Sequence, residues 1–237
     1  DAKHFCPNEF GCPPQITGRI QHFISRKCMD IEGLGGETVD LLRKKGLVSN
    51  YADLYDLEVS QLIPLERMAE KSALNVVAGI EKSKEIPFEK VLFALGIRFV
   101  GETVAKKLAK YFKNIDALMS ASFEDLLQVD EIGDKIASSI VEFSNDFFSI
   151  QLIARLKRYG LQLELSQVQL ENQSDVLRGQ TFVVSGVFHS LSRNELKKTI
   201  EDNGGKVSSS ISKKTSFVIA GDQMGPSKLE KAEKFGI

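Results

Sequence analysis

The stretch Ile97-Arg98-Phe99-Val100-Gly101 is one copy of a short pattern that occurs four times in this chain and decides its fold. The other copies are Ile31-Glu32-Gly33-Leu34-Gly35, Leu65-Glu66-Arg67-Met68-Ala69 and Val129-Asp130-Glu131-Ile132-Gly133. The copies begin at residues 31, 65, 97 and 129, and another aliphatic residue stands eight positions after the central apolar residue of each. A nearly constant period of this size predicts one supersecondary unit used four times.

Each copy predicts a tight turn that ends in a small residue and opens a helix, because apolar residues follow the turn at helical spacing. The small residues are Gly35, Ala69, Gly101 and Gly133. The first amides of a helix have no partner within the helix, and the helix dipole is positive there. Such a turn suits a phosphate if no side chain blocks its approach. The residues also allow the alternative that these are ordinary turns between helices.

Four such turns in register resemble the helix-hairpin-helix family, whose turns hold the backbone of duplex DNA without reading its bases. The resemblance implies DNA contacts at four glycines, Gly33, Gly35, Gly101 and Gly133. The second copy departs from the pattern, because Arg67-Met68-Ala69 lacks both glycines and leaves Arg67 as its phosphate ligand. Lys71 and Lys135, three residues beyond the central apolar positions, would add charge in the second and fourth copies.

Length and composition are consistent with several domains that each bury a core, since the chain has 237 residues and is 42% hydrophobic. Its 31 basic and 32 acidic side chains nearly cancel, whereas a purely electrostatic nucleic-acid binder is strongly basic. Backbone amides and local lysine clusters would therefore supply most of any DNA contact. We find no apolar run long enough to cross a membrane and no signal-peptide pattern, so no membrane partner is expected.

Three cysteines do not suggest a disulfide framework, so we expect a reducing, cytoplasmic location. Cys6 and Cys12 lie in a compact stretch with Pro and Gly, which is typical of half a tetrahedral zinc site. His22 and Cys28 could complete the site locally. Residues 20–29, however, predict a helix that would place these two side chains far from a common face. We therefore expect the missing ligands upstream of the chain, with Cys28 a small buried residue.

The last part of the chain predicts a different architecture. Residues 181–186 and 216–221 predict two buried strands, and residues 206–211 alternate like a third. Ser192-Arg193-Asn194-Glu195 predicts a capping box that opens a helix ended by glycine, and Ser227-Lys228-Leu229-Glu230 predicts a second capping box. Strand, helix, strand, strand, helix indicates a small α/β domain with a parallel sheet.

This order of elements, with the Gly204-Gly205 pair, resembles the BRCT module, which normally adds one more strand and helix. In BRCT modules that bind phosphate, a small hydroxyl residue and a glycine end the first strand, and a lysine opens the second helix. The resemblance implies an anion site at Ser185, Gly186 and Lys228, to which Arg193 could add a guanidinium fork. Alternatively, Ser185-Gly186 is only a turn and Lys228 a solvated helix residue.

With the cysteine stretch, the hairpins and this module in one order, the whole chain resembles the carboxy-terminal part of the bacterial NAD-dependent DNA ligases. Lys71-Ser72-Ala73, Ala94-Leu95-Gly96-Ile97-Arg98 and Val100-Gly101-Glu102 are similar to internal signatures of that family. The resemblance implies the second half of a four-cysteine zinc module at 1–24 and four hairpin repeats at 25–165. A linker at 166–174 and a BRCT domain at 175–237, truncated at its end, would follow.

The resemblance also implies a function in sealing nicks in duplex DNA. We find no adenylylation lysine motif, so the catalytic groups, NAD and Mg would be bound outside this chain, which would clamp nicked DNA as a monomer and be inactive alone. Two alternatives remain: a repair scaffold without enzymatic activity, and a helical array that binds only proteins. The small residue kept at all four turns argues against the array.

Overall fold

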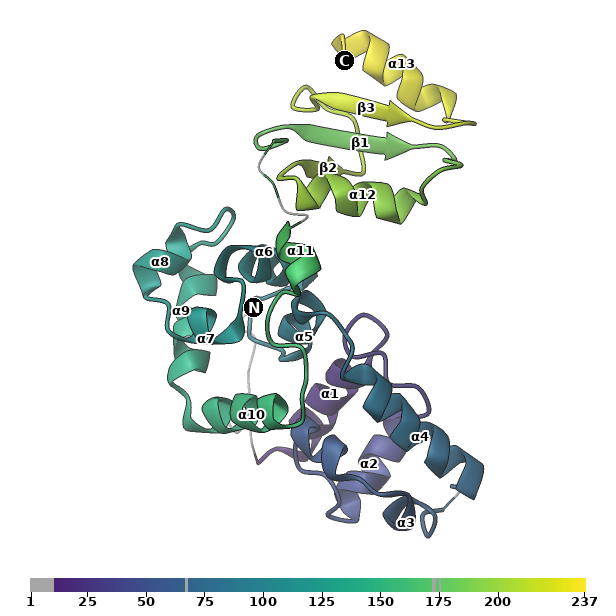
Figure 1. Ribbon diagram of the computed structural model, residues 1–237, viewed down its shortest axis with the longest axis vertical. Coiled ribbons are helices and arrows are strands. Elements are labelled where there is room, and N and C mark those ends of the chain that lie inside the picture. Colours follow the sequence, from purple (N-terminus) through teal and green to yellow (C-terminus); the bar gives the residue numbers. More distant parts are fainter. Residues whose placement is uncertain (1–10, 67, 172–173, 175) are drawn as a thin grey trace, which may run out of the picture. The chain divides into compact units, whose positions relative to one another are not determined.

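The computed structural model describes residues 11–66, 68–171, 174 and 176–237, and it divides after Leu165 into two compact units (Figure 1). The first unit is helical, and the second carries a small parallel sheet with a helix on each face. The predicted fold class, a mainly helical hairpin domain followed by a small α/β domain, is confirmed. None of the described helices is long and apolar enough to cross a membrane.

Four pairs of helices form the hairpins of the first unit, and the two members of each pair pack against each other. The pairs are α1 (Pro13–Ile24) with α2 (Gly36–Lys44), α3 (Val59–Leu62) with α4 (Glu70–Ser83), α5 (Phe88–Ala94) with α6 (Glu102–Phe112), and α8 (Phe123–Leu127) with α9 (Asp134–Asn145). The connecting and flanking elements are the 3-10 helix η1 (Tyr51–Asp56), α7 (Ile115–Met119) and α10 (Phe147–Arg158).

The repeated aliphatic positions supply the core of this unit. Leu42, Val76, Leu108 and Ile140, eight positions after the central apolar residues, are all buried. Each of them anchors the second helix of its hairpin, while charged side chains of the same helix face outward. The sequence repeat therefore reflects one burial pattern that is used in every hairpin.

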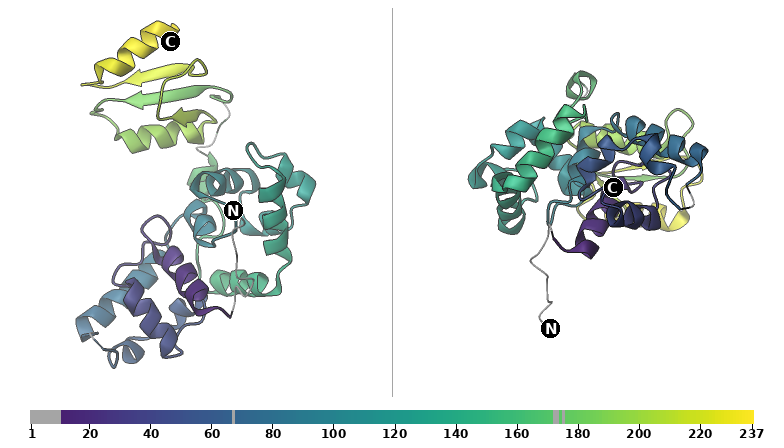
Figure 2. Two further views of the ribbon diagram at one scale, coloured as in Figure 1. Left: turned by 180° about the vertical axis from the view of Figure 1, so that it is seen from behind. Right: turned by 90° about the horizontal axis from the view of Figure 1, so that it is seen from below.

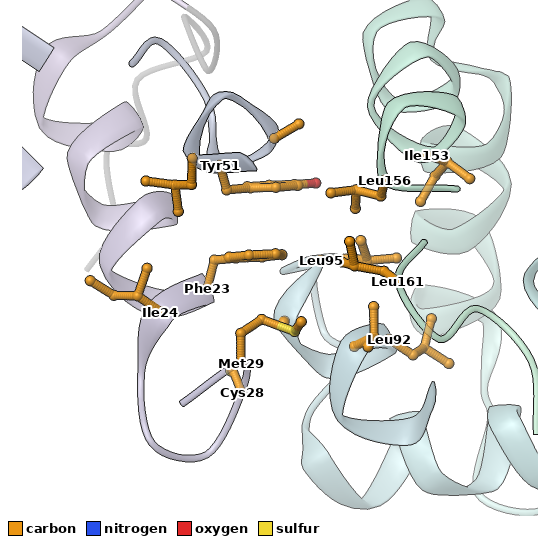
Figure 3. Close-up of a cluster of buried hydrophobic side chains, with 14 of the residues drawn as sticks. Phe23, Ile24, Cys28, Met29, Tyr51, Leu92, Leu95, Ile153, Leu156 and Leu161 are labelled. Carbon is orange, nitrogen blue, oxygen red and sulfur yellow. The ribbon is translucent and has the colours of Figure 1, made fainter. Parts of the chain in front are cut away.

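A cluster of apolar side chains joins elements that are far apart in the sequence (Figure 3). Phe23 of α1 and Tyr51 of η1 stack with ring centroids 4.5 Å apart. Leu95 follows α5, and Leu156 and Leu161 come from α10 and the segment after it. Complete burial of Phe23 contributes on the order of 2–3 kcal/mol. This cluster ties the first hairpin to the third and to the helix that follows the fourth.

The first helix differs from its prediction. The sequence predicts a helix over 20–29, whereas α1 begins at a proline pair and ends at Ile24. Proline is tolerated in the first helical turn, because those amides have no helical partner. After Ile24 the chain turns back, and the amide of Met29 donates a hydrogen bond to the carbonyl of Phe23.

The second unit is built around a three-stranded sheet (Figures 1 and 2). Its elements are α11 (Gln167–Glu171), β1 (Thr181–Ser185), α12 (Arg193–Asp202), β2 (Lys206–Ser208), β3 (Phe217–Ala220) and α13 (Pro226–Phe235). β1 is the middle strand and pairs in parallel with both neighbours, with Phe182 opposite Val207 and Phe217. The predicted order of elements from β1 to α13 and the parallel sheet are confirmed, but α11 lies in the segment expected to be a linker.

Successive residues of β1 face the two helices, because a strand points its side chains alternately to opposite faces. Phe182 and Val184 pack with Ile200 of α12, whereas Val183 packs with Ala232 of α13. The middle strand is thus buried on both faces, which explains its unbroken apolar run.

The other two strands depart from their predictions. Phe217 of β3 is half exposed, so this strand is not buried as expected. The physical reason is its place at an edge of the described sheet, where it pairs only with β1. β2 ends at Ser208 rather than at Ile211, because the Ser208 hydroxyl and the Ser210 backbone bond each other in a turn.

The start of α13 also differs from its prediction. The sequence predicts a capping box from Ser227, whereas the helix begins at Pro226 with Gly225 as its N-cap and without a side-chain cap. Proline at the first helical position has the backbone angle that a helix needs and lacks an amide that would need a partner. Lys228 is therefore the third residue of α13.

A polar cluster joins α10 to η1. The guanidinium of Arg155 donates hydrogen bonds to the carboxylates of Asp53, at 2.7 Å, and Asp56, at 2.8 Å. Burial raises the pKa of Asp53, but hydrogen bonds from Ser49, Arg155 and Asn50 outweigh burial and hold the pKa below its ordinary value. The two segments are about a hundred residues apart in the sequence, so this cluster joins the end of the helical unit to its first half.

We expect Arg155→Met to lower the free energy of unfolding by about 2 kcal/mol at neutral pH, because it leaves the Asp53 carboxylate without its cation. The folded state lowers the pKa of Asp53, so this stabilisation is present above the unfolded value of 3.8 and is lost as the pH falls through the lower folded value. The free energies of unfolding of variant and parent should therefore differ less in acid than at neutral pH. Urea denaturation at both pH values measures this.

Lys157→Met is the control, since it removes an exposed ion pair with Asp116. Exposed ion pairs contribute little to stability, so we expect Lys157→Met to lower the free energy of unfolding by at most about 0.5 kcal/mol. Equal losses for the two variants at neutral pH would contradict the argument.

Candidate nucleic-acid interface

The same backbone geometry opens the second helix of every hairpin. Gly35, Ala69, Gly101 and Gly133 are the N-cap residues of α2, α4, α6 and α9. Their φ angles lie between −105° and −74° and their ψ angles between 156° and 176°. The carbonyl of each accepts a hydrogen bond from the amide four residues later. The structure therefore places the small residues of the four copies at equivalent helix starts.

In the part of the chain that the structure describes, the N-cap residue of each of these four helices makes no side-chain hydrogen bond to the first turn. Elsewhere in the chain, Asn114, Ser122, Asp146 and Ser192 each accept a hydrogen bond from an amide in the first turn of their helix. The first amides of a helix need acceptors from side chains, water or a ligand. The first amides of the hairpin helices can therefore donate hydrogen bonds to water or to a bound ligand. The helix dipole favours a negatively charged ligand at this end.

Three of the N-cap glycines face open space. A Cβ atom on Gly35, Gly101 or Gly133 would meet no other atom within 4 Å. Their negative φ angles are open to any residue, so neither packing nor backbone conformation requires glycine there. What the glycines do provide is an unobstructed helix start, which a backbone contact to phosphate needs.

Gly33 has a different role in its turn. Its φ of 82° is left-handed, and a Cβ atom there would lie 3.0 Å from a methyl group of Val76. Phe99 and Glu131, at the equivalent positions of the third and fourth turns, adopt φ of 65° although they are not glycine. Turn shape and packing therefore account for Gly33, and its DNA contact stays a prediction. Arg67, the equivalent residue of the second turn, lies outside the described residues.

The charged side chains near the turns differ in their surroundings. Lys71 and Lys135 both follow their N-cap by two residues and are exposed. Lys107 of α6 instead places its ammonium 2.9 Å from Asp130 and 2.8 Å from Glu131, in the fourth turn. Sequence reasoning missed this double ion pair. The only signal for it is two neighbouring acids in a turn, which do not identify their partner.

The tip of the third turn carries an exposed side-chain pair. The Arg98 guanidinium lies 4.8 Å from the ring centroid of Phe99, and both side chains are exposed. This is a cation–π contact, which favours one orientation of a long, flexible cation. Sequence reasoning assigned neither residue a role, because the left-handed backbone that holds Phe99 outward becomes visible only in the structure.

Most of the predicted anion-site residues of the second unit meet at the carboxyl end of β1. Ser185 is buried, and its carbonyl accepts a hydrogen bond from the amide of Gly221 at 2.8 Å. Gly186 has φ of 101°, and a Cβ atom there would lie 2.5 Å from the Gly221 carbonyl oxygen. Nη2 of Arg193 donates to the carbonyl of Val184 at 2.9 Å, which holds the start of α12 against β1.

Lys228 stands apart from this group. It lies in the first turn of α13 and is half-buried. Among the residues that the structure describes, no side-chain hydrogen bond or ion pair joins it to Ser185, Gly186 or Arg193. Gly186 and Arg193 thus have structural roles, and the anion site stays a prediction.

Of the predicted zinc ligands, Cys12 is the N-cap of α1, and Cys6 lies outside the described residues. Cys28 is fully buried, as predicted. Its sulfur lies 3.6 Å from Nε2 of His22, because the chain turns back after α1, so the prediction that these side chains point apart is wrong. The contact with Cys28 and a hydrogen bond to the Phe93 carbonyl outweigh burial and raise the pKa of His22. In the described ranges, no three His, Cys, Asp or Glu side chains are grouped to hold a metal.

Two families match parts of the chain. Residues 90–153, which run from α5 into α10 and include the third and fourth turns, match the helix-hairpin-helix motif. Residues 172–237 match the BRCA1 C Terminus (BRCT) domain. The first and second hairpins are thus identified by their geometry.

The full length of the chain is also similar to larger proteins. It is 66% identical over 236 residues to the DNA ligase of Christiangramia forsetii and 67% identical over 237 residues to that of Flavobacterium johnsoniae. The DNA ligase of Bacteroides fragilis is 56% identical over 237 residues. The whole chain is homologous to one part of a DNA ligase. These alignments cover 100% of this chain but only 36% of each of these DNA ligases.

We expect glycine substitutions to separate the open positions from the packed one. Gly101→Ala should cost less than about 1 kcal/mol, because the N-cap has room and a permitted φ. Gly186→Ala should cost more than about 2 kcal/mol, because it combines a left-handed φ with a backbone clash. Thermal unfolding measures both, and similar losses would show that the two positions do not differ as described.

Proposed function

We propose that this chain is the DNA-clamping carboxy-terminal region of an NAD-dependent DNA ligase, which seals nicks in duplex DNA by forming phosphodiester bonds in replication and repair. The observation that carries the proposal is similarity over the whole chain to the DNA ligases of several bacteria. The uncapped, unobstructed starts of the hairpin helices support it, since they suit the phosphates of a DNA backbone.

In this proposal the chain positions DNA and carries out no chemistry. The enzyme would take adenylate from NAD, transfer it to the 5′-phosphate at a nick, and release AMP when the 3′-hydroxyl attacks that phosphate. These steps, with NAD and Mg, belong to segments of the ligase outside this chain. The hairpins would hold the duplex on either strand without reading its sequence, and the protein would act as a cytoplasmic monomer.

Zinc would have a structural role in the same proposal. Cys6 and Cys12 would supply two thiolates, and a structural zinc site needs four ligands. Among the residues that the structure describes, no three His, Cys, Asp or Glu side chains are grouped to hold a metal. The remaining ligands would therefore come from outside the described residues, and zinc would fix the segment that precedes α1.

The BRCT domain would hold an anion near the nick. Ser185, Gly186 and Arg193 lie at one end of β1, and Lys228 would add charge from α13. Lys228→Ala in the 237-residue chain should weaken binding to a duplex that carries a nick with a 5′-phosphate, and have less effect on an intact duplex. Gel-shift titrations with both duplexes measure this, and equal affinity of variant and parent for the nicked duplex would leave Lys228 as a solvated residue.

We expect the 237-residue chain to bind duplex DNA regardless of sequence, yet neither to react with NAD nor to seal nicks. If backbone amides make most phosphate contacts, log K should fall with log salt with a shallow slope of about 2 to 5, since each phosphate-neutralising side chain adds about 0.9. Gly101→Val should weaken binding by blocking the helix start and leave that slope nearly unchanged, as measured by fluorescence anisotropy across a salt series.

Several outcomes would contradict this proposal. A strong preference for one duplex sequence, or no binding at low salt, would exclude a backbone clamp. If folded Gly101→Val binds like the parent, the helix starts are structural. Duplex binding in a protein whose full gene lacks an adenylylation lysine would favour the repair scaffold.

A further inference from the structure

The four hairpins differ strongly in charge. Residues 97–113, which contain the third turn and α6, carry five cations and one carboxylate, a net charge of +4. The equivalent residues 129–145 of the fourth hairpin carry one cation and four carboxylates, a net charge of −3. Residues 31–47 and 65–81 of the first and second hairpins carry 0 and −1. Of the four hairpins, the third alone carries a net positive charge, which attracts a polyanion.

The tips of the third and fourth turns offer different chemistry on the same backbone. Phe99 and Glu131 occupy equivalent positions and share φ of 65°. Phe99 is 53% exposed and supports the Arg98 guanidinium, so this tip presents one cation and one aromatic ring to solvent. Glu131 and its neighbour Asp130 present two carboxylates, which repel a phosphate that approaches the start of α9.

Lys107 connects these two turns. It lies on the basic helix α6, and its ammonium contacts both Asp130 and Glu131. Its charge is thus used within the protein, where it holds the fourth turn against α6 and offsets part of the acidic charge there. The contact makes the fourth turn a support for the third hairpin.

We propose that the third hairpin makes the main DNA contact of the helical unit, with Arg98 binding a backbone phosphate and Phe99 lying against the deoxyribose of the adjoining groove wall. The fourth hairpin then serves mainly to hold the third in place. This inference rests on the proposed DNA-clamping function and adds to it which hairpin and which side chains meet the duplex. Phosphate contacts of this kind position the protein without selecting a sequence.

A matched pair of glycine substitutions tests the inference. Phe99→Gly and Glu131→Gly both relieve a left-handed residue, so both variants should fold and unfold at temperatures close to or above that of the parent. Phe99→Gly should bind a short duplex about fivefold to tenfold more weakly, because it removes the ring and the support of Arg98. Glu131→Gly should bind as tightly as the parent or more tightly, since it removes a repelling charge while the ion pair between Lys107 and Asp130 still holds the fourth turn against α6.

A second pair tests the charge. Arg98→Gln should weaken duplex binding about tenfold and lower the salt slope by about 1, as expected for a lost phosphate contact. Lys157→Gln removes the same charge from an exposed position on α10 and should leave the slope unchanged. Affinity at several salt concentrations, with circular dichroism to verify folding, gives both values.

The outcomes separate this inference from the proposed function. If the parent binds duplex DNA while Phe99→Gly and Arg98→Gln bind equally well, the clamp remains and the assignment to the third hairpin is wrong. A loss for Glu131→Gly as large as that for Phe99→Gly would also overturn it. If the parent chain does not bind duplex DNA at low salt, the proposed function and this inference both fail.

Discussion

The uncapped amides at the starts of α2, α4, α6 and α9 are the constraint on which the helical unit depends. A helix start without a side-chain cap has to be held by other contacts, and each of these helices is anchored by a buried aliphatic residue two turns further on. Asn, Ser or Asp caps α7, α8 and α10, whereas α1, α5 and α13 also begin without a side-chain cap. Burial holds the helix in place, and its first turn stays available to an acceptor.

Long-range contacts join the four short hairpins into one compact unit. The stacked rings of Phe23 and Tyr51 join α1 to η1, and Arg155 ties α10 back to η1. Lys107 links α6 to the fourth turn. A nearly neutral chain can present a basic surface in one place only if its acids lie elsewhere, and these contacts decide where they lie. The sequence sets the charge difference between the third and fourth hairpins, and the assembled unit brings a cation of the third into contact with two acids of the fourth.

The packing of the second unit depends on one strand and on a few residues at its carboxyl end. One strand, β1, is buried on both faces and carries the packing of α12 and α13. At its carboxyl end, Gly186 and Gly221 let two loops approach more closely than any side chain would permit. Arg193 fixes the start of α12 by bonding a β1 carbonyl. Gly186 and Arg193, which the sequence motif suggests as ligands, thus also have structural roles. A motif alone therefore does not establish a binding site.

The amino-acid sequence by itself determined the number of hairpins, their turns, the N-cap glycines and the order of elements around a parallel sheet. These features follow from local physics: the spacing of apolar residues, the backbone freedom of glycine and the alternation of a strand. The tertiary structure alone decided that His22 meets Cys28, that Lys107 pairs with Asp130 and Glu131, and that Phe99 stands exposed beneath Arg98. Each depends on where a helix stops or on how the chain returns between distant residues, and no local pattern encodes that path.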